Sequence, residues 1–424
     1  MKKRWNILAM ILCTSLFVAG CTEKTPNSGT NTASANNTNN KADEKQSNLD
    51  VLQPGAYGNV QGLSLEKGTT ISIIGRGSSS AYWTEVKVGA EKAIADINSN
   101  LGYKGEDKVK LTYSAPETED DVDDQVNILD EELARYPAAL GIAAVDSEAC
   151  EVQFDLAAEN GIPVVAFDSG TNYQDIVSMI DTNNVEAASM AANKLSDMID
   201  DQGEVMMLVH DNKSTSAHER EDGFRSTIEE KHSEIQIVES YHLDELELLK
   251  QQIEQEKSAA EDENDSNKES GTSENELSRT DENKEDIQEN QDGAKEEEAA
   301  SDEEAMDMTQ EDAVKYLLEK HPDVKGIYTT NETTAKLVIS VLKNLEIYDV
   351  TVVSFDGGKD QLKRLEDGDI EGLIVQNPYG IGYATVVACA RAILGQGNEA
   401  EVNAGYTWVT QDNLNDESIQ KMMY

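Results

Sequence analysis

The chain has 424 residues, of which 83 are acidic and 35 are basic, giving a formal net charge of −48 at pH 7. A chain of this length has room for two domains with substantial apolar cores. So large an excess of negative charge argues against functions that depend on binding nucleic-acid phosphates or anionic lipid headgroups, although much of it is local and says little about the folded lobes.

The first 21 residues are predicted to be a secretory signal. Lys2-Lys3-Arg4 is a basic start, and the apolar run over residues 7–17 is too short to span a membrane comfortably. The signal ends in Val18-Ala19-Gly20-Cys21, which resembles a bacterial lipobox. The resemblance implies that Cys21 becomes the mature N-terminus and carries two acyl chains, which anchor a protein stably where one does not. The alternative is an ordinary cleaved signal in which Cys21 occurs by chance.

Residues 22–68 are expected to form a flexible spacer between this anchor and the folded part. From Thr22 to Gln53 the chain is rich in Asn, Thr, Ser and Lys and has almost nothing to bury. Without apolar burial, such a segment cannot offset the entropy lost on ordering.

From Thr69 onward, strand-like and helix-like periods alternate. Alternation of this kind predicts an α/β fold with parallel sheets covered by helices on both faces. Two runs of it meet near residues 181–184, which predicts two doubly wound parallel-sheet lobes. The expected strands are 70–74, 109–113, 138–143, 163–167, 176–180, 204–209, 235–240, 326–328, 351–355 and 373–375. The expected helices are 82–98, 121–135, 148–160, 186–199, 216–230, 244–255, 309–320, 333–345 and 359–366.

An acidic segment interrupts this pattern, and residues 256–308 are predicted to be a disordered insertion in the second lobe. Glu261 to Glu304 contains 19 acidic and 4 basic residues, and few large aliphatic side chains. It lacks the His and Cys of a zinc site and the carboxylate spacing of an EF-hand, so we interpret it as a solvated segment. Because loop-closure entropy grows slowly with length, the fold can accommodate it.

Polar residues follow several apolar strands at the point where each strand ends. Phe167-Asp168-Ser169-Gly170 and Phe355-Asp356-Gly357-Gly358 share one pattern, and Gln376 ends the next strand. Ligands bind beyond the carboxyl ends of strands in such sheets, so the pattern predicts a site for a small polar molecule. For each Asp taken singly, a helix cap is an equally good explanation.

Other candidate positions are weaker when each is taken alone. Tyr82-Trp83 begins a helix and indicates either two aromatic walls of a cleft or one core ring and one surface ring. Arg220 and Asn331 lie near helix starts, where solvated side chains would also be expected.

Residues 75–80, GRGSSS, lack the third glycine and the acidic partner of a dinucleotide fingerprint, so no cofactor is expected. Cys150 and Cys389 are expected to be buried free thiols rather than a disulfide.

Taken together in this order, these residues resemble the periplasmic sugar-binding proteins of the ribose- and galactose-binding type, which serve ABC importers. The likeness includes Arg220-x-x-Gly223-Phe224, residues 321–327 leading to Asn331, and Ile374-Val375-Gln376-Asn377-Pro378. It implies a type I periplasmic-binding-protein fold, whose lobes here would be 69–182 with 378–405 and 183–377 with 406–424. A three-strand hinge would join these lobes.

The resemblance also implies the site residues. Tyr82 and Trp83 would stack on a sugar, and its hydroxyls would be bonded by Asp168, Arg220, Asn331, Asp356 and Gln376. Ser80 stands where the family often has Asn and Ser169 where ribose binders have Arg, which argues against ribose itself.

The function implied is a lipid-anchored, monomeric receptor on the outer face of the bacterial membrane that delivers a sugar-like ligand to an ABC permease. One alternative is a receptor that presents its closed form to a membrane chemoreceptor or kinase. Another is a secreted sugar-acting enzyme, for which Asp168 and Asp356 would be the only candidate carboxylate pair. No nucleophile motif is present, so a non-enzymatic role is expected.

Overall fold

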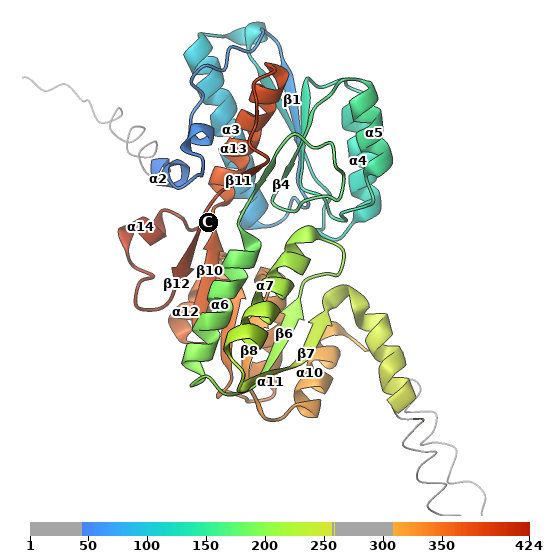
Figure 1. Cartoon of the computed structure of the whole chain (residues 1–424), viewed down its shortest axis with the longest axis vertical. Coiled ribbons are helices and arrows are strands. Elements are labelled where there is room, and N and C mark those ends of the chain that lie inside the picture. Colours follow the sequence, from blue (N-terminus) through green and yellow to red (C-terminus); the bar gives the residue numbers. More distant parts are fainter. Residues whose placement is uncertain (1–44, 257, 259–307) are drawn as a thin grey trace, which may run out of the picture. The chain divides into compact units, whose positions relative to one another are not determined.

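The computed structural model describes residues 45–256, 258 and 308–424. Within them the chain forms two six-stranded sheets, each covered by helices on both faces (Figure 1). This confirms the predicted α/β fold of two parallel-sheet lobes. The predicted leader with Cys21 and residues 259–307 of the acidic insertion lie outside the described residues.

The first sheet is wholly parallel, with strand order β11-β5-β4-β3-β1-β2. Its strands are β1 (Thr70–Ile74), β2 (Lys110–Ser114), β3 (Ala139–Ile142), β4 (Val164–Phe167), β5 (Met179–Asp181) and β11 (Glu401–Asn403). The helices that pack on it are α3 (Ala81–Leu101), α4 (Val122–Leu133), α5 (Glu151–Glu159) and α13 (Pro378–Ile393).

The second sheet has the order β12-β10-β9-β8-β6-β7, and only β12 runs antiparallel. Its strands are β6 (Gly203–Val209), β7 (Ile235–His242), β8 (Val324–Thr329), β9 (Thr351–Phe355), β10 (Gly372–Gln376) and β12 (Tyr406–Val409). The helices of this lobe are α6 (Asn184–Met198), α7 (Thr215–Lys231), α10 (Gln310–Lys320), α11 (Glu332–Asn344) and α12 (Lys359–Asp367). A further helix covers residues 246–256.

Successive strand residues enter opposite layers, as the two-residue period of a strand requires. Ile73 packs in the cluster with α3 and α13, whereas its neighbour Ile74 packs with α4 and α5. In the second lobe, Met206 packs with α10 and α11, and Met207 with α6 and α7. Both faces of each sheet are therefore buried, which explains why the strands are continuous apolar runs in the sequence.

Two glycines allow α3 and α13 to cross in close contact. A Cβ atom at Gly382 would lie 1.9 Å from the carbonyl oxygen of Val86, and one at Gly89 would lie 2.1 Å from that of Tyr379. Any side chain at either position would separate the helices. This contact positions the N-terminal end of α3, where Tyr82 and Trp83 lie.

The chain passes between the two sheets three times. It crosses from β5 to α6, from β10 to α13, and from β11 to β12. Thus α13 covers the first sheet although the strand before it belongs to the second. These passages fall within residues 181–184, 376–378 and 403–406.

The prediction of a flexible spacer is wrong for residues 45–68. This segment contains the helix α2 (Gln46–Asp50) and a 3-10 turn η1 (Gly55–Gly58), and Gln53 exchanges backbone hydrogen bonds of 2.9 and 3.0 Å with Asn403. Its apolar side chains are spaced widely along the chain but converge on the core of the first lobe; they are Leu49, Leu52, Tyr57, Leu63 and Leu65. Widely spaced apolar residues without a regular period give no helix or strand signal, so the sequence alone does not show that this segment packs on the lobe.

Cys150 and Cys389 are buried free thiols, as predicted. Burial raises the pKa of the Cys150 thiol to about 11, so this side chain is neutral at physiological pH. Among the helices of residues 45–256 and 308–424, none is long and apolar enough to cross a membrane.

Candidate ligand-binding site

A cavity of about 820 Å³ is lined by residues that follow the carboxyl ends of strands in both sheets. Eight of the nine predicted ligand-binding residues line it: Ser80, Tyr82, Trp83, Asp168, Arg220, Asn331, Asp356 and Gln376. Ser169 is the exception, because it is buried behind Asp168, where its hydroxyl accepts a hydrogen bond from Ser216 at 3.5 Å. The fold therefore brings the predicted set together, while the contact of each residue with a ligand remains a prediction.

Tyr82 and Trp83 form one wall of this cavity. Ser80 caps α3 by accepting a hydrogen bond from the Trp83 N–H at 3.4 Å, which directs the first turn of the helix at the cavity. The two rings are 5.2 Å apart at an interplanar angle of 83°, and both are buried. The alternative of one core ring and one surface ring is therefore wrong.

Asp168 follows β4, and its carboxylate accepts a hydrogen bond from the Tyr82 hydroxyl. Burial, followed by the charge of Asp168, raises the pKa of the Tyr82 hydroxyl well above its ordinary value. Tyr82 is therefore a neutral donor whose hydroxyl is directed at the carboxylate. This contact orders both side chains at the cavity wall.

Asp356 follows β9, is as buried as Asp168, and is held by two hydrogen-bond donors. Its Oδ1 accepts from Gln376 Nε2 at 2.6 Å, and its Oδ2 accepts from the Glu332 N–H at the start of α11 at 3.0 Å. Asp356 therefore does not cap α12, the helix that follows it in sequence; Gly358 is at that cap. Burial raises the pKa of Asp356, whereas Arg220 and the bond from Gln376 oppose the rise. Such a carboxylate would be stabilised further by a ligand hydroxyl.

Arg220 joins the site to the segments that connect the lobes. Its Nε donates to Asn184 Oδ1 at 2.9 Å, and its Nη2 donates to Gln376 Oε1 at 3.0 Å. Thr182 donates to the same Gln376 oxygen at 3.0 Å. The guanidinium also lies 4.3 Å from the centre of the Phe355 ring. Because residues 182–184 and 376 belong to two of the three passages, the network couples the cavity wall to them.

Asn331 is both a lining residue and a helix cap. Its side chain accepts from the Thr334 N–H at 2.9 Å at the start of α11, and the Thr334 hydroxyl in turn accepts from the Asn331 N–H at 3.1 Å. The capping role explains the residue without a ligand. Asn331 also lines the cavity, where a ligand contact is the predicted second role.

Sequence reasoning missed a pair of charged residues that joins the lobes. Arg76, which follows β1, donates from Nη2 to Asp211 Oδ2 at 2.8 Å and to the Glu119 carbonyl at 3.2 Å. Asp211 follows β6 in the other lobe, and both side chains are largely buried and line the cavity. The sequence carried the same signal as at Asp168, a polar residue just beyond a strand. Arg76 lies within the GRGSSS stretch of residues 75–80, whose likeness to a cofactor loop hides this role.

Two further lining residues, Glu119 and His210, were also missed. Burial raises the pKa of Glu119, and the charge of Arg76 opposes the rise. Burial lowers the pKa of His210 to about 3, so its ring is neutral, and its Nδ1 lies 2.7 Å from Thr330 Oγ1. Within the described residues, no group of three or more His, Cys, Asp or Glu side chains could hold a metal ion.

Comparison with known proteins identifies the family. A model of the periplasmic binding protein domain matches residues 71–265 and 246–397. The D-apiose import binding protein of Paraburkholderia graminis is 23% identical over 290 residues, 67% of this chain and 71% of that protein. The ribose import binding protein of Salmonella typhimurium is 33% identical over 85 residues, which are 20% of this chain and only 29% of that protein.

A solved structure has the same fold. The carbohydrate transporter solute-binding protein of Agrobacterium radiobacter, in complex with D-arabinose, superposes with a TM-score of 0.63 at 23% identity, covering 84% of this chain and 99% of that one. The family match extends over most of the chain and both lobes. The chain therefore belongs to the periplasmic binding protein domain family.

Proposed function

We propose that this protein is an extracytoplasmic receptor that binds a sugar in the cavity between its lobes and delivers it to an ABC permease. The observation that carries the proposal is the convergence of Asp168 and Asp356, one from each lobe, beside the wall formed by Tyr82 and Trp83. Carboxylates accept from sugar hydroxyls, and aromatic faces pack against the C–H face of a sugar ring. The similarity to D-apiose and ribose import binding proteins and to a D-arabinose complex supports a sugar as the ligand.

Binding is expected to close the lobes and exclude water. We assign residues 69–182 with 378–405, together with the packed segment 45–68, to one lobe and 183–377 with 406–424 to the other, a division supported by the strand membership of the two sheets and by the core cluster of the first lobe. Movement about the three connecting passages would let the sugar enter. Once water is excluded, a wrong sugar leaves buried polar groups unpaired, which gives specificity.

The first experiment is a thermal-shift screen of the purified protein against D-ribose, D-arabinose, D-apiose and other monosaccharides, followed by calorimetry. At least one sugar is expected to bind with a dissociation constant of about 1 μM or below, corresponding to roughly −8 kcal/mol or better. The recovered sugar should be chemically unchanged by mass spectrometry, because the proposed role is binding without catalysis. A screen without saturable binding of any monosaccharide would contradict the sugar-receptor proposal. Chemical conversion of a bound sugar would favour the alternative of a secreted sugar-acting enzyme.

We further propose that Cys21 carries the lipid that holds the receptor on the outer face of the membrane. The lipobox-like Val18-Ala19-Gly20-Cys21 supports this. Cells expressing the wild-type chain should incorporate labelled palmitate into it, and cells expressing the Cys21→Ala variant should not. Label in the variant would show that the anchor lies elsewhere. Loss of uptake of the identified sugar on deletion of the gene would support delivery to a permease.

A further inference from the structure

Tyr424 lies between residues of the two lobes that border the candidate site. Its ring packs edge-on against the ring of Tyr82, with centroids 5.6 Å apart and an interplanar angle of 75°. Its hydroxyl oxygen accepts a hydrogen bond from the Gly357 N–H at 3.1 Å. Tyr82 begins α3 in the first lobe, and Gly357 directly follows Asp356 in the second. One side chain therefore contacts both the aromatic wall and the backbone beside a predicted ligand carboxylate.

The segment that carries Tyr424 is attached to the second lobe. After β12, residues Leu414 and Ile419 are buried in the apolar cluster beneath α10 and α11, and Gln411 donates to the Leu365 carbonyl of α12 at 2.8 Å. The chain then returns from α14 (Glu417–Gln420) to the junction of the two sheets, where its end is marked in Figure 1. The contact between Tyr424 and Tyr82 therefore joins one lobe to the other.

Besides its edge-on contact with Trp83, Tyr82 has two partners outside its own helix. Its hydroxyl donates to Asp168, and its ring packs against Tyr424. Tyr424 also packs against the apolar clusters of both lobes. Edge-to-face pairs of aromatic rings are favourable beyond the area they bury, and a buried N–H without an acceptor is unfavourable. Loss of Tyr424 would remove one of the two rings that pack edge-on against Tyr82 and leave the Gly357 N–H without this acceptor.

We propose that Tyr424 is a positioning residue of the ligand cavity, which holds Tyr82 and the backbone beside Asp356 in the binding arrangement when the lobes are closed. The proposal rests on the proposed sugar-binding function. Tyr424 is not a lining residue of the cavity, so it acts through these neighbours. Because the contact joins the lobes, its loss should mainly speed release of the sugar, while the association rate should change little.

The test compares Tyr424→Leu, which removes the ring and the hydroxyl, with Tyr424→Phe, which keeps the ring. Tyr348→Leu is the matched control, because Tyr348 is 78% exposed in the turn between α11 and β9. Binding of D-ribose, D-arabinose and D-apiose is measured by calorimetry, and their release by stopped flow with Trp fluorescence. We expect about tenfold weaker binding and faster release for Tyr424→Leu, a smaller effect for Tyr424→Phe, and wild-type binding for the control.

A measurement without sugar separates this proposal from the proposed function. Unfolding in urea is measured for Tyr82→Leu, Tyr424→Leu and the double variant. If the Tyr424 and Tyr82 rings stabilise each other, the loss of unfolding free energy in the double variant will differ from the sum of the losses in the two single variants. Additive effects, or wild-type release rates in Tyr424→Leu, would overturn the positioning role. If the wild-type protein binds no monosaccharide in the thermal-shift screen but the unfolding effects of the two Tyr substitutions are coupled, the sugar-receptor proposal is overturned and the contact between Tyr424 and Tyr82 is established.

Discussion

Asp168 and Asp356 occupy corresponding places in the two lobes. Each follows an inner parallel strand with a positive φ angle, +58° for Asp168 and +80° for Asp356. Each also donates its backbone N–H to a carbonyl of the neighbouring strand at 2.8 Å, that of Ile180 in one lobe and that of Ile374 in the other. Positive φ is uncommon outside glycine and is concentrated at functional sites. The shared backbone turn places one carboxylate from each lobe at the same cavity.

This geometry makes it possible to separate the carboxylate from the backbone at each position. Replacing Asp168 or Asp356 by Gly should weaken sugar binding by about 10- to 100-fold, because a charged hydrogen-bond acceptor is lost. The matching Ala variants should lose as much affinity. Their unfolding free energy should be lower than that of the Gly variants by roughly 1 kcal/mol, because alanine is strained at positive φ and glycine is not. Calorimetry and urea unfolding measure the two effects. Wild-type affinity in both Ala variants would refute the assignment of the site.

The ion pair of Arg76 and Asp211 should stabilise the arrangement in which the lobes are in contact. Replacing Arg76 by Met or Asp211 by Asn leaves the other charge buried and unpaired, which should cost about 3–5 kcal/mol in unfolding free energy without sugar. The double variant should cost less than the sum of the two, with a coupling of at least about 1 kcal/mol. Additive effects in urea unfolding would show that the pair is solvated and separated in solution.

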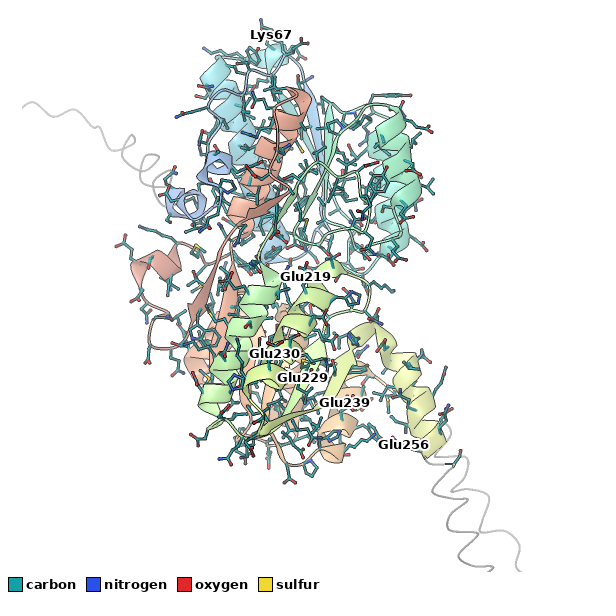
Figure 2. All side chains as sticks on the ribbon, in the orientation of Figure 1. Lys67, Glu219, Glu229, Glu230, Glu239 and Glu256 are labelled. Carbon is teal, nitrogen blue, oxygen red and sulfur yellow. The ribbon has the colours of Figure 1, made fainter. Side chains whose placement is uncertain are left out.

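Asp181 should make stability depend on pH. It ends β5 at a passage between the lobes, is 6% exposed, and its Oδ1 has no hydrogen-bond partner among the described residues. Burial, followed by the charges of Glu219 and Glu401, raises its pKa from 3.8 to about 8. Glu219 lies beside the same passage, near the first turn of α7 (Figure 2), and its Oε2 accepts from Asn184 at 3.0 Å.

The direction of this pH effect follows from the raised pKa. Below pH 4 the group is protonated in both folded and unfolded chains; between about pH 4 and pH 8 only the folded chain retains the proton. The unfolding free energy of the wild type should therefore fall as pH rises through this window. Asp181→Asn should be more stable than the wild type by roughly 1–3 kcal/mol at pH 8 and equal to it at pH 4. If urea unfolding gives the same difference in unfolding free energy between Asp181→Asn and the wild type at pH 4 and pH 8, Asp181 is not the group responsible for the pH dependence.

Deletion of residues 261–304 should leave affinity and melting temperature nearly unchanged. The helices on either side contact each other directly: Glu256, labelled in Figure 2, lies in one of them. Its carboxylate accepts from the Tyr316 hydroxyl at 2.6 Å and pairs with Lys320 at 2.8 Å. These contacts hold the flanking ends in place, and loop-closure entropy changes little with length. The variant Glu256→Ala, made in the shortened chain, controls for the flanking contact. A large loss of sugar affinity on deletion would show that the segment takes part in binding.

The sequence by itself determined the order of strands and helices from β1 to β10 and the edge of each sheet where the candidate site lies, but it did not predict α13, β11 or β12. The signals for these elements are local: apolar β-branched runs such as 351–355, helix caps, and the glycine after Asp356. Because both faces of each sheet are buried, the strands are continuous apolar runs that can be recognised without tertiary information. Only the tertiary structure decided that Arg76 pairs with Asp211, 135 positions away, and that Tyr424 packs on Tyr82. It also decided that residues 45–68 are part of the first lobe. The physical reason is that these contacts bring together segments distant in the chain, and no local period records which partner a side chain meets.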